Sequence, residues 1–134
     1  MITVSQEHAA PRAADIDALP GLYDGLIKLA RSALDISGFG VQVLDLPPSY
    51  TTDSHDERAT GQEELYVALR GSGGVVLGDG HSIPVAEGRL VVVPPACSRA
   101  LASGPDGLRL LVVGGTPGRA FEPPAWTEAE ESAR

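Results

Sequence analysis

Histidine and carboxylate side chains come close together in the sequence at His55, Glu57 and Glu64. An imidazole nitrogen with carboxylate oxygens is a donor set that suits manganese, iron or zinc. Tight binding of a transition metal usually takes three protein ligands or more. These three could meet only if the polar segment 49–62 brings His55 and Glu57 onto Glu64. We expect instead that His55 is an exposed loop residue and that no cofactor is bound, with a divalent metal as the alternative.

Charge and cysteine content exclude several other kinds of chemistry. The chain has 134 residues and a net charge of −8, so phosphate backbones and anionic membrane surfaces would repel it. We therefore expect no nucleic-acid partner and no membrane partner. Cys97 is the single cysteine, which rules out an internal disulfide or a cysteine-rich metal site. With no apolar signal core at the N-terminus, the expected location is the cytoplasm.

The elements that must position these side chains are short strands. Glycine contributes 16 residues and proline 11, spread along the whole chain, which argues against a helical bundle. Between these turn formers lie short apolar or alternating segments that are typical of strands. They are VQVLDL (41–46), ELYVALR (64–70), VVL (75–77), SIPVA (82–86), RLVVV (89–93), SRALA (98–102) and LRLLVV (108–113). Turns are predicted between them at 71–74, 78–80 and 104–107, so the pattern predicts an all-β sandwich or barrel.

The two ends of the chain differ from this central region. Apolar residues at spacings of three and four in 21–36 predict one or two short helical turns ending at Gly38, although a strand near 27–30 would also fit. The segment after position 115 predicts an extended arm with an acidic tail. The expected organisation is an N-terminal arm or short helix at 1–37, a barrel at 38–115 and a C-terminal arm at 116–134.

Two segments resemble the two motifs of the cupins, which are small jelly-roll β-barrels. The first cupin motif reads G-x5-H-x-H-x3,4-E-x6-G, and Glu64 and Gly71 match its second half within QEELYVALRG (62–71). The second motif reads G-x5-P-x-G-x2-H-x3-N, and Gly88 and Pro94 match its opening within EGRLVVVPPACSR (87–99). The resemblance implies a cupin-type double-stranded β-helix.

The metal-binding half of the cupin pattern is not preserved. The two histidine positions before Glu64 hold either Arg58 and Thr60 or Glu57 and Ala59, depending on the spacing, and the histidine position of the second motif holds Arg99. Arginine carries only hydrogen-bond donors and does not ligate a metal. The resemblance implies that Glu64 and Arg99 face each other in the barrel, so we expect an ion pair where the metal would be.

The resemblance also implies which side chains line the cavity. If Glu64 points inward, strand alternation places Tyr66 on the same face. We therefore expect catalytic roles for Glu64, Tyr66 and Arg99. Ligand binding is expected from Arg99, Tyr66, Gln62 and His55, with Arg99 gripping a carboxylate or carbonyl oxygen of a small organic ligand. The equally weighted alternative is that the Arg99–Glu64 pair only fills and orders the barrel.

Three functions remain open from the sequence. The first is a small-molecule-binding cupin without the usual metal ligands, acting as a metal-independent isomerase, epimerase or cyclase through Glu64, Tyr66 and Arg99. The second is a metal-dependent, dioxygenase-like enzyme that uses His55, Glu57 and Glu64. The third is a non-catalytic sensor or assembly barrel. Because cupins commonly pair their sheets, the resemblance also implies a homodimer.

Overall fold

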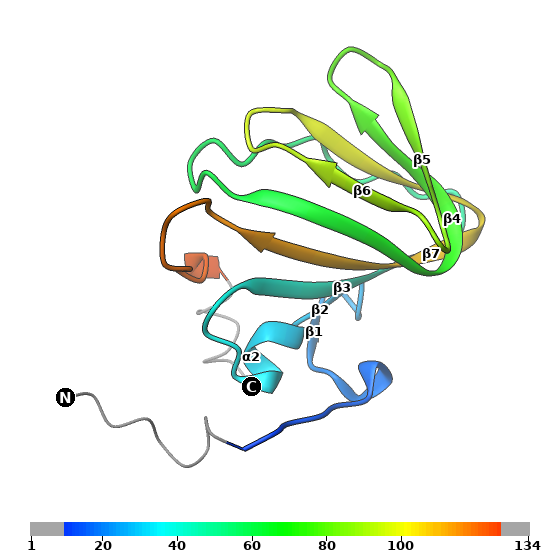
Figure 1. Ribbon diagram of the computed structural model, residues 1–134. Coiled ribbons are helices and arrows are strands. Elements are labelled where there is room, and N and C mark those ends of the chain that lie inside the picture. The colour runs from blue at the N-terminus through cyan, green and yellow to red at the C-terminus, as the bar shows by residue number, and fades with distance from the viewer. Residues whose placement is uncertain (1–9, 127–134) are drawn as a thin grey trace.

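Strands make up most of the regular secondary structure in residues 10–126, the part of the chain that the computed structural model describes (Figure 1). The elements are η1 (Ile16–Ala18), β1 (Gly21–Leu22), β2 (Ile27–Lys28), α2 (Ala30–Leu34), β3 (Gly40–Leu46), β4 (Glu63–Leu77), β5 (Ser82–Ala86), β6 (Leu90–Val93) and β7 (Arg99–Gly115). The strands pair in the order β1-β2-β3-β7-β4-β5, and β6 pairs with β4. Each pair is antiparallel, so the all-β prediction is confirmed.

Two long strands, β4 and β7, bend to run through both layers of the barrel. The first half of β4 pairs with β6 and with the second half of β7, and the second half of β4 pairs with β5 and with the first half of β7. The turns predicted at 71–74 and 104–107 were therefore wrong, because the chain bends there without reversing. The predicted turn at 78–80 is present, since the amide of Gly80 donates to the carbonyl of Leu77 at 2.9 Å.

Glycine at these bends allows two backbones to approach closely. Register shifts lie between Ala68 and Arg70 and between Gly71 and Gly73, which marks a β-bulge in β4. Gly71 has a φ of 81°, and a Cβ there would collide with the carbonyl oxygen of Gly107 on β7. Sequence reasoning treated such glycine clusters as reversals, yet a bulge requires the same freedom of φ. The cupin-like position of Gly71 is thus a bend in a continuous strand.

The apolar core lies inside the barrel and ends at a group of polar side chains. Inward-facing residues of all the long strands contribute to it, and they include Tyr66, Ala68, Val75, Val85, Val93, Leu101 and Leu110. Gln62 and Arg99 are the buried polar residues of the described part of the chain, with 7% and 0% of their surface exposed. A fully buried guanidinium requires partners, so its surroundings identify the part of the core that can carry chemistry.

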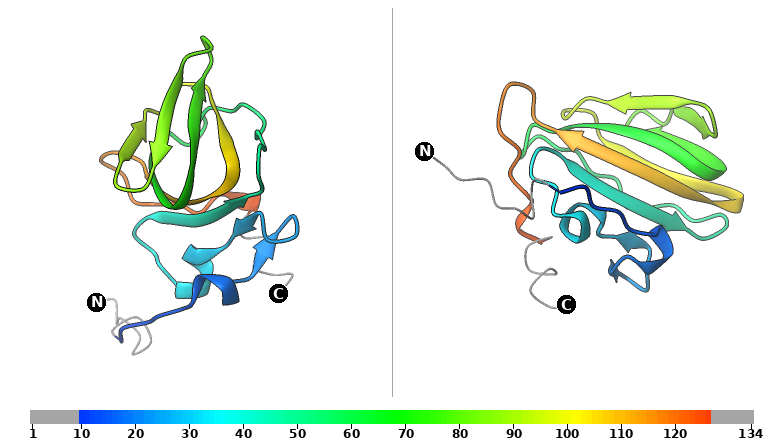
Figure 2. Two further views of the ribbon diagram at one scale, coloured as in Figure 1. Left: turned by 90° about the vertical axis from the view of Figure 1, so that its right-hand side faces the viewer. Right: turned by 60° about the horizontal axis from the view of Figure 1, so that its bottom comes forward.

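The N-terminal segment packs beneath β3 (Figure 2), and it contains both a short helix and the strand near 27–30 that was the alternative to it. The two-residue strands β1 and β2 pair through a tight turn in which Tyr23, Asp24 and Gly25 all have positive φ. Helix α2 follows, and Asp35 ends it in the left-handed conformation, three residues before the predicted end at Gly38. Pairing of β2 with β3 overrides the helical spacing of the apolar residues. Among residues 10–126, no helix has the length and hydropathy needed to cross a membrane.

The outer face of the sheet around β6 is apolar and open. Leu90 and Val92 are 69% and 59% exposed, and Val67 and Leu65 lie opposite them on β4. The homodimer implied by the cupin resemblance stays a prediction, and this face is where it would form.

We expect Val92→Glu to give a monomer at concentrations where the wild type is a dimer, because a carboxylate would be buried in the interface. Size-exclusion chromatography with light scattering measures the mass directly. Arg89→Glu, at an exposed position just before β6, is the control for added negative charge. A monomeric wild type, or a dimeric Val92→Glu variant, would refute the prediction.

Candidate functional site

The polar segment between β3 and β4 is held against the start of β7, and this places His55. Isolated bridges pair Thr51 with Ala102 and His55 with Arg99. The amide of His55 donates to the carbonyl of Arg99 at 2.9 Å, and the amide of Arg99 donates back at 2.8 Å. The hydroxyl of Thr52 accepts from the amide of Leu101 at 2.9 Å. A segment predicted as a free loop therefore behaves like an added strand.

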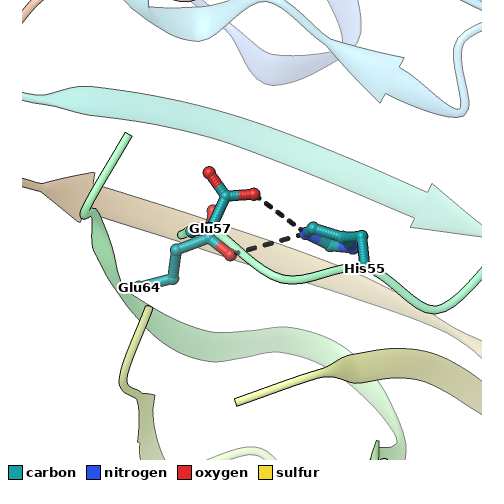
Figure 3. Close-up of side chains that lie close together, drawn as sticks. All are labelled: His55, Glu57 and Glu64. Atoms are coloured by element: carbon teal, nitrogen blue, oxygen red, sulfur yellow. Dashed lines mark ion pairs between the residues drawn. The ribbon is translucent and has the colours of Figure 1, made fainter. Parts of the chain in front are cut away.

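His55, Glu57 and Glu64 converge at one end of the barrel (Figure 3). Nε2 of His55 lies 3.2 Å from Oε2 of Glu57 and 4.0 Å from Oε1 of Glu64. The His55 side chain is 47% exposed, whereas the two carboxylates are 20% and 16% exposed. His55 is thus half-exposed, as expected of a loop residue, but its ring is directed at two carboxylates.

Behind Glu64, three side chains form a hydrogen-bonded chain that ends in the core. The Tyr66 hydroxyl donates to Oε1 of Glu64 at 2.8 Å, and Nε of Arg99 donates to the Tyr66 oxygen at 3.2 Å. Nη2 of Arg99 lies 3.3 Å from the same Oε1, and its Nη1 donates to the carbonyl of Cys97 at 2.8 Å. The expected Glu64–Arg99 pairing is therefore present. Within residues 10–126 these contacts all use Oε1, so Oε2 of Glu64 is left for a ligand.

Burial and pairing shift the acidities of these groups in different directions. Burial raises the pKa of Glu64 above 4.5, and it also raises the pKa of Tyr66, so the phenol stays protonated as a donor. The hydrogen bond between His55 and Glu57 raises the pKa of His55 above 6.5 and lowers that of Glu57 below 4.5. The site can therefore hold a poorly solvated carboxyl next to a histidinium.

A cavity of about 260 Å³ opens beside these residues. Its polar end includes His55, Glu57, Gln62, Glu64 and Tyr66, and its walls are mostly apolar. Most of the predicted site residues are thus brought together around one pocket.

Arg99 is the predicted site residue that does not line this pocket. It has no exposed surface and lies behind Tyr66 and Glu64. This placement favours a role in holding Glu64 over direct contact with a ligand.

Sequence reasoning missed the side chains that form the pocket walls. They come from both chain ends and include Leu26, Leu29, Arg31, Phe121, Pro124 and Trp126. Trp126 was interpreted as a packing residue of the C-terminal arm, but it lies at the pocket and is 46% exposed. The concentration of aromatic and proline residues in FEPPAW (121–126) was the available signal.

The ligand atoms at this end of the pocket, one imidazole nitrogen and two carboxylates, are of types that bind divalent metals. The ligand atoms of His55, Glu57 and Glu64 lie within 4.8 Å of one another. Donors on one first-row ion are about 3.0–3.4 Å apart when each bond is about 2.1 Å long, so small side-chain rotations would complete the set. Arg99 opposes it, because its guanidinium already faces Oε1 of Glu64 and repels a cation.

Comparison with known proteins supports the fold. No protein-family model matches the chain, and no curated protein matches its sequence. An uncharacterised protein with a double-stranded β-helix domain from Klebsiella pneumoniae has a similar structure, with a TM-score of 0.64, 16% identity, and coverage of 84% of this chain and 95% of the other. A sugar phosphate isomerase of the cupin superfamily from Silicibacter pomeroyi has a TM-score of 0.61, 20% identity, and coverage of 79% and 77%.

A third similar structure is a cupin protein from Bacteroides fragilis, with a TM-score of 0.60, 23% identity, and coverage of 74% of this chain and 82% of the other. Together with the strand order, these likenesses define an antiparallel double-stranded β-helix. The chain has the cupin fold, as the resemblance of 62–71 and 87–99 to the cupin motifs implied.

The His55–Glu57 pair makes a testable electrostatic prediction. We expect NMR titration of His55 to give a pKa above 6.5, and Glu57→Gln to lower it, because the amide cannot stabilise the imidazolium as a carboxylate does. The raised pKa of His55 means that its contribution to stability is complete below pH 6.5 and is lost as pH rises through the folded-state pKa. The lowered pKa of Glu57 means that its contribution is present above pH 4.5 and is lost as pH falls through its own folded-state pKa. An unchanged His55 pKa in Glu57→Gln would contradict the pairing.

Proposed function

We propose that this chain is a small-molecule cupin enzyme that moves a proton at a carbon next to a carbonyl group, as isomerases and epimerases do, without using a metal. One observation carries the proposal: the Glu64 carboxylate is only 16% exposed, is held through Oε1 by Tyr66, and borders a pocket. A base that is poorly solvated and fixed in position is what such a reaction requires. Because the pocket is open, we favour this function over the non-catalytic barrel.

The pocket residues divide the proton transfer between a base and an acid. Oε2 of Glu64 takes the proton as the C–H bond breaks, and that electron pair becomes the new C=C bond of an enol. The carbonyl electrons move onto oxygen, which receives a proton from His55. Glu57, at 3.2 Å from Nε2, favours the charged form of His55 before this step. To isomerise the substrate, Glu64 returns the proton to the former carbonyl carbon, and the hydroxyl on the first carbon gives its proton to neutral His55 as it becomes the new carbonyl. To epimerise it, the first carbon takes a proton from solvent on its opposite face, Glu64 releases its proton to solvent, and the enol hydroxyl gives its proton back to His55.

The experiment is deuterium exchange into 2-hydroxyacetophenone in D2O, followed by proton NMR after the protein has been dialysed against a chelator. This probe has an apolar ring and an enolisable hydroxyketone. We expect a rate above that of buffer and a bell-shaped pH profile. The rate should rise as Glu64 loses its proton, at a pKa above 4.5, and fall as His55 loses its proton, at a pKa above 6.5. No acceleration at any pH would refute the proposal.

A second candidate function is a metal-dependent cupin enzyme, favoured by the convergence of His55, Glu57 and Glu64. When bound, a divalent metal would supply Lewis-acid or redox chemistry at the pocket end. Elemental analysis of untagged protein tests this candidate, because stoichiometric manganese, iron or zinc that is lost in His55→Ala would identify the ligands. Exchange activity that survives chelation favours the metal-independent function.

A further inference from the structure

The pocket has two ends of different chemistry. Its body is walled by apolar side chains from distant parts of the chain: Leu26 and Leu29 from the N-terminal segment, Leu101 and Val112 from β7, and Phe121 and Trp126 from the C-terminal arm. Small-ligand pockets usually measure about 300–1,000 Å³, so the volume of about 260 Å³ limits the ligand to one ring or a short chain.

The polar end of the pocket consists mainly of hydrogen-bond acceptors. Glu57 and Glu64 both line it, and the exposed Asp53 also lines the pocket. The two basic residues among the described lining residues each lie beside an acceptor of the protein itself. His55 is 3.2 Å from Glu57, and Arg31 donates to the carbonyl of Ile36 at 3.1 Å.

The buried guanidinium of Arg99, behind this end of the pocket, does not make it attractive to anions. Arg99 has no exposed surface, and its charge is directed at Oε1 of Glu64 at 3.3 Å. A ligand in the pocket therefore meets the free carboxylate oxygen of Glu64 and the carboxylate of Glu57 before it meets the guanidinium. A carboxylate or phosphate placed there would be repelled, whereas an N–H or O–H group would find acceptors.

We infer that the pocket selects a molecule with a ring-sized apolar body and a hydrogen-bond-donating head, a hydroxyl or an ammonium group, and that it rejects anions. This inference deepens the proposed function by naming its substrate class, and it rests on the same pocket. It reverses the expectation that Arg99 grips the carboxylate of a ligand. It also separates this chain from the sugar phosphate named for one similar structure, whose phosphate would be disfavoured here.

Three probes with the same ring test the head-group preference: 2-phenylethylamine, 2-phenylethanol and phenylacetate. We expect NMR chemical-shift titrations of the wild-type protein to give dissociation constants for the amine and the alcohol that are at least about ten-fold lower than that for phenylacetate. Shifted amides should lie around the pocket. Glu57→Gln should reduce the preference for the amine over phenylacetate, because it removes one acceptor charge. Asp79→Asn removes the same charge at the exposed β4–β5 hairpin and should leave the preference unchanged.

Trp126→Ala should weaken all three probes to a similar extent, because it removes part of the wall that contacts the ring. Equal or tighter binding of phenylacetate, or no binding of any probe at about 20 mM, would overturn the inference. Its failure is distinguishable from failure of the proposed function. If the protein shows head-group selectivity but no deuterium exchange, it is a binding protein with this specificity. If it shows exchange but no selectivity, it is an enzyme with a different substrate class.

Discussion

Glu64→Gln is expected to lower the rate of deuterium exchange into 2-hydroxyacetophenone by about 10²–10⁴-fold, the usual contribution of a positioned general base. Glutamine can still accept from Tyr66 through its side-chain oxygen, so the local geometry should change little. It cannot take up a proton, and the reaction would lose its base while keeping its pocket. The loss should therefore appear in kcat, with a smaller effect on KM.

The neighbouring residue provides a matched control for this variant. Glu63 precedes Glu64 on β4 but is exposed and does not line the pocket. Glu63→Gln changes the net charge by the same amount and should retain the wild-type rate. Tyr66→Phe should have an intermediate effect, because it removes the donor to Oε1 and alters the pH profile on its acidic side. Equal rates for Glu64→Gln and Glu63→Gln would show that Glu64 is not the base.

Arg99→Met is expected to reduce the free energy of unfolding by about 3–5 kcal/mol near pH 8, the usual cost of removing one partner from a buried ion pair. Methionine retains an unbranched apolar chain, so most of the effect comes from the lost charge and hydrogen bonds. Arg99 is completely buried, and it bonds both Tyr66 and the carbonyl of Cys97. Urea denaturation measures the change directly.

The loss in Arg99→Met should depend on pH in a defined direction. Without the guanidinium, the already raised pKa of Glu64 moves higher still. A raised carboxyl pKa gives stability that is complete below the unfolded-state pKa and is lost as pH rises through the folded-state pKa. The free energy of unfolding of the variant should therefore be closer to that of the wild type near pH 5 than near pH 8.

A double variant and a surface control keep this prediction specific. Arg99→Met with Glu64→Gln should recover part of the lost stability near pH 8, because no unpaired charge then remains in the barrel. Arg89→Met, at an exposed site, should change stability by less than about 0.5 kcal/mol. If Arg99→Met is no less stable than Arg89→Met, the buried pair does not stabilise the fold.

Much of the fold could be predicted because its signals are local in the sequence. Alternation in 41–46 and 64–70 predicted β3 and the first half of β4, and GDG (78–80) predicted the hairpin turn. The predictions at 71–74 and 104–107 failed because a bulge and a reversal require the same glycines, and only pairing between distant strands distinguishes them. In 21–36 the sequence predicted short helical turns with a strand near 27–30 as the alternative, and only pairing with β3 decided that both are present.

The candidate site could be predicted in part. The pairing of Glu64 with Arg99 followed from residue types at cupin motif positions, and Tyr66 followed from strand alternation. The placement of His55 did not follow, because it depends on backbone hydrogen bonds to Arg99, which lies 44 positions further along the chain. The apolar walls from 26–29 and 121–126 were not predicted either, since neither segment has a local pattern that indicates where it packs.

The sequence by itself determined the antiparallel barrel, the positions of its main strands, and a carboxylate facing an arginine where cupins commonly hold a metal. These depend on short-range periodicity and on fixed motif spacing. Only the tertiary structure decided that Arg99 is buried behind Glu64 and Tyr66, that His55 joins two carboxylates, and that segments 26–32 and 121–126 wall the pocket. The physical reason is that the electrostatic potential and the solvent exposure at a site depend on residues from several segments. Long-range strand pairing brings these residues together, and no single segment encodes it.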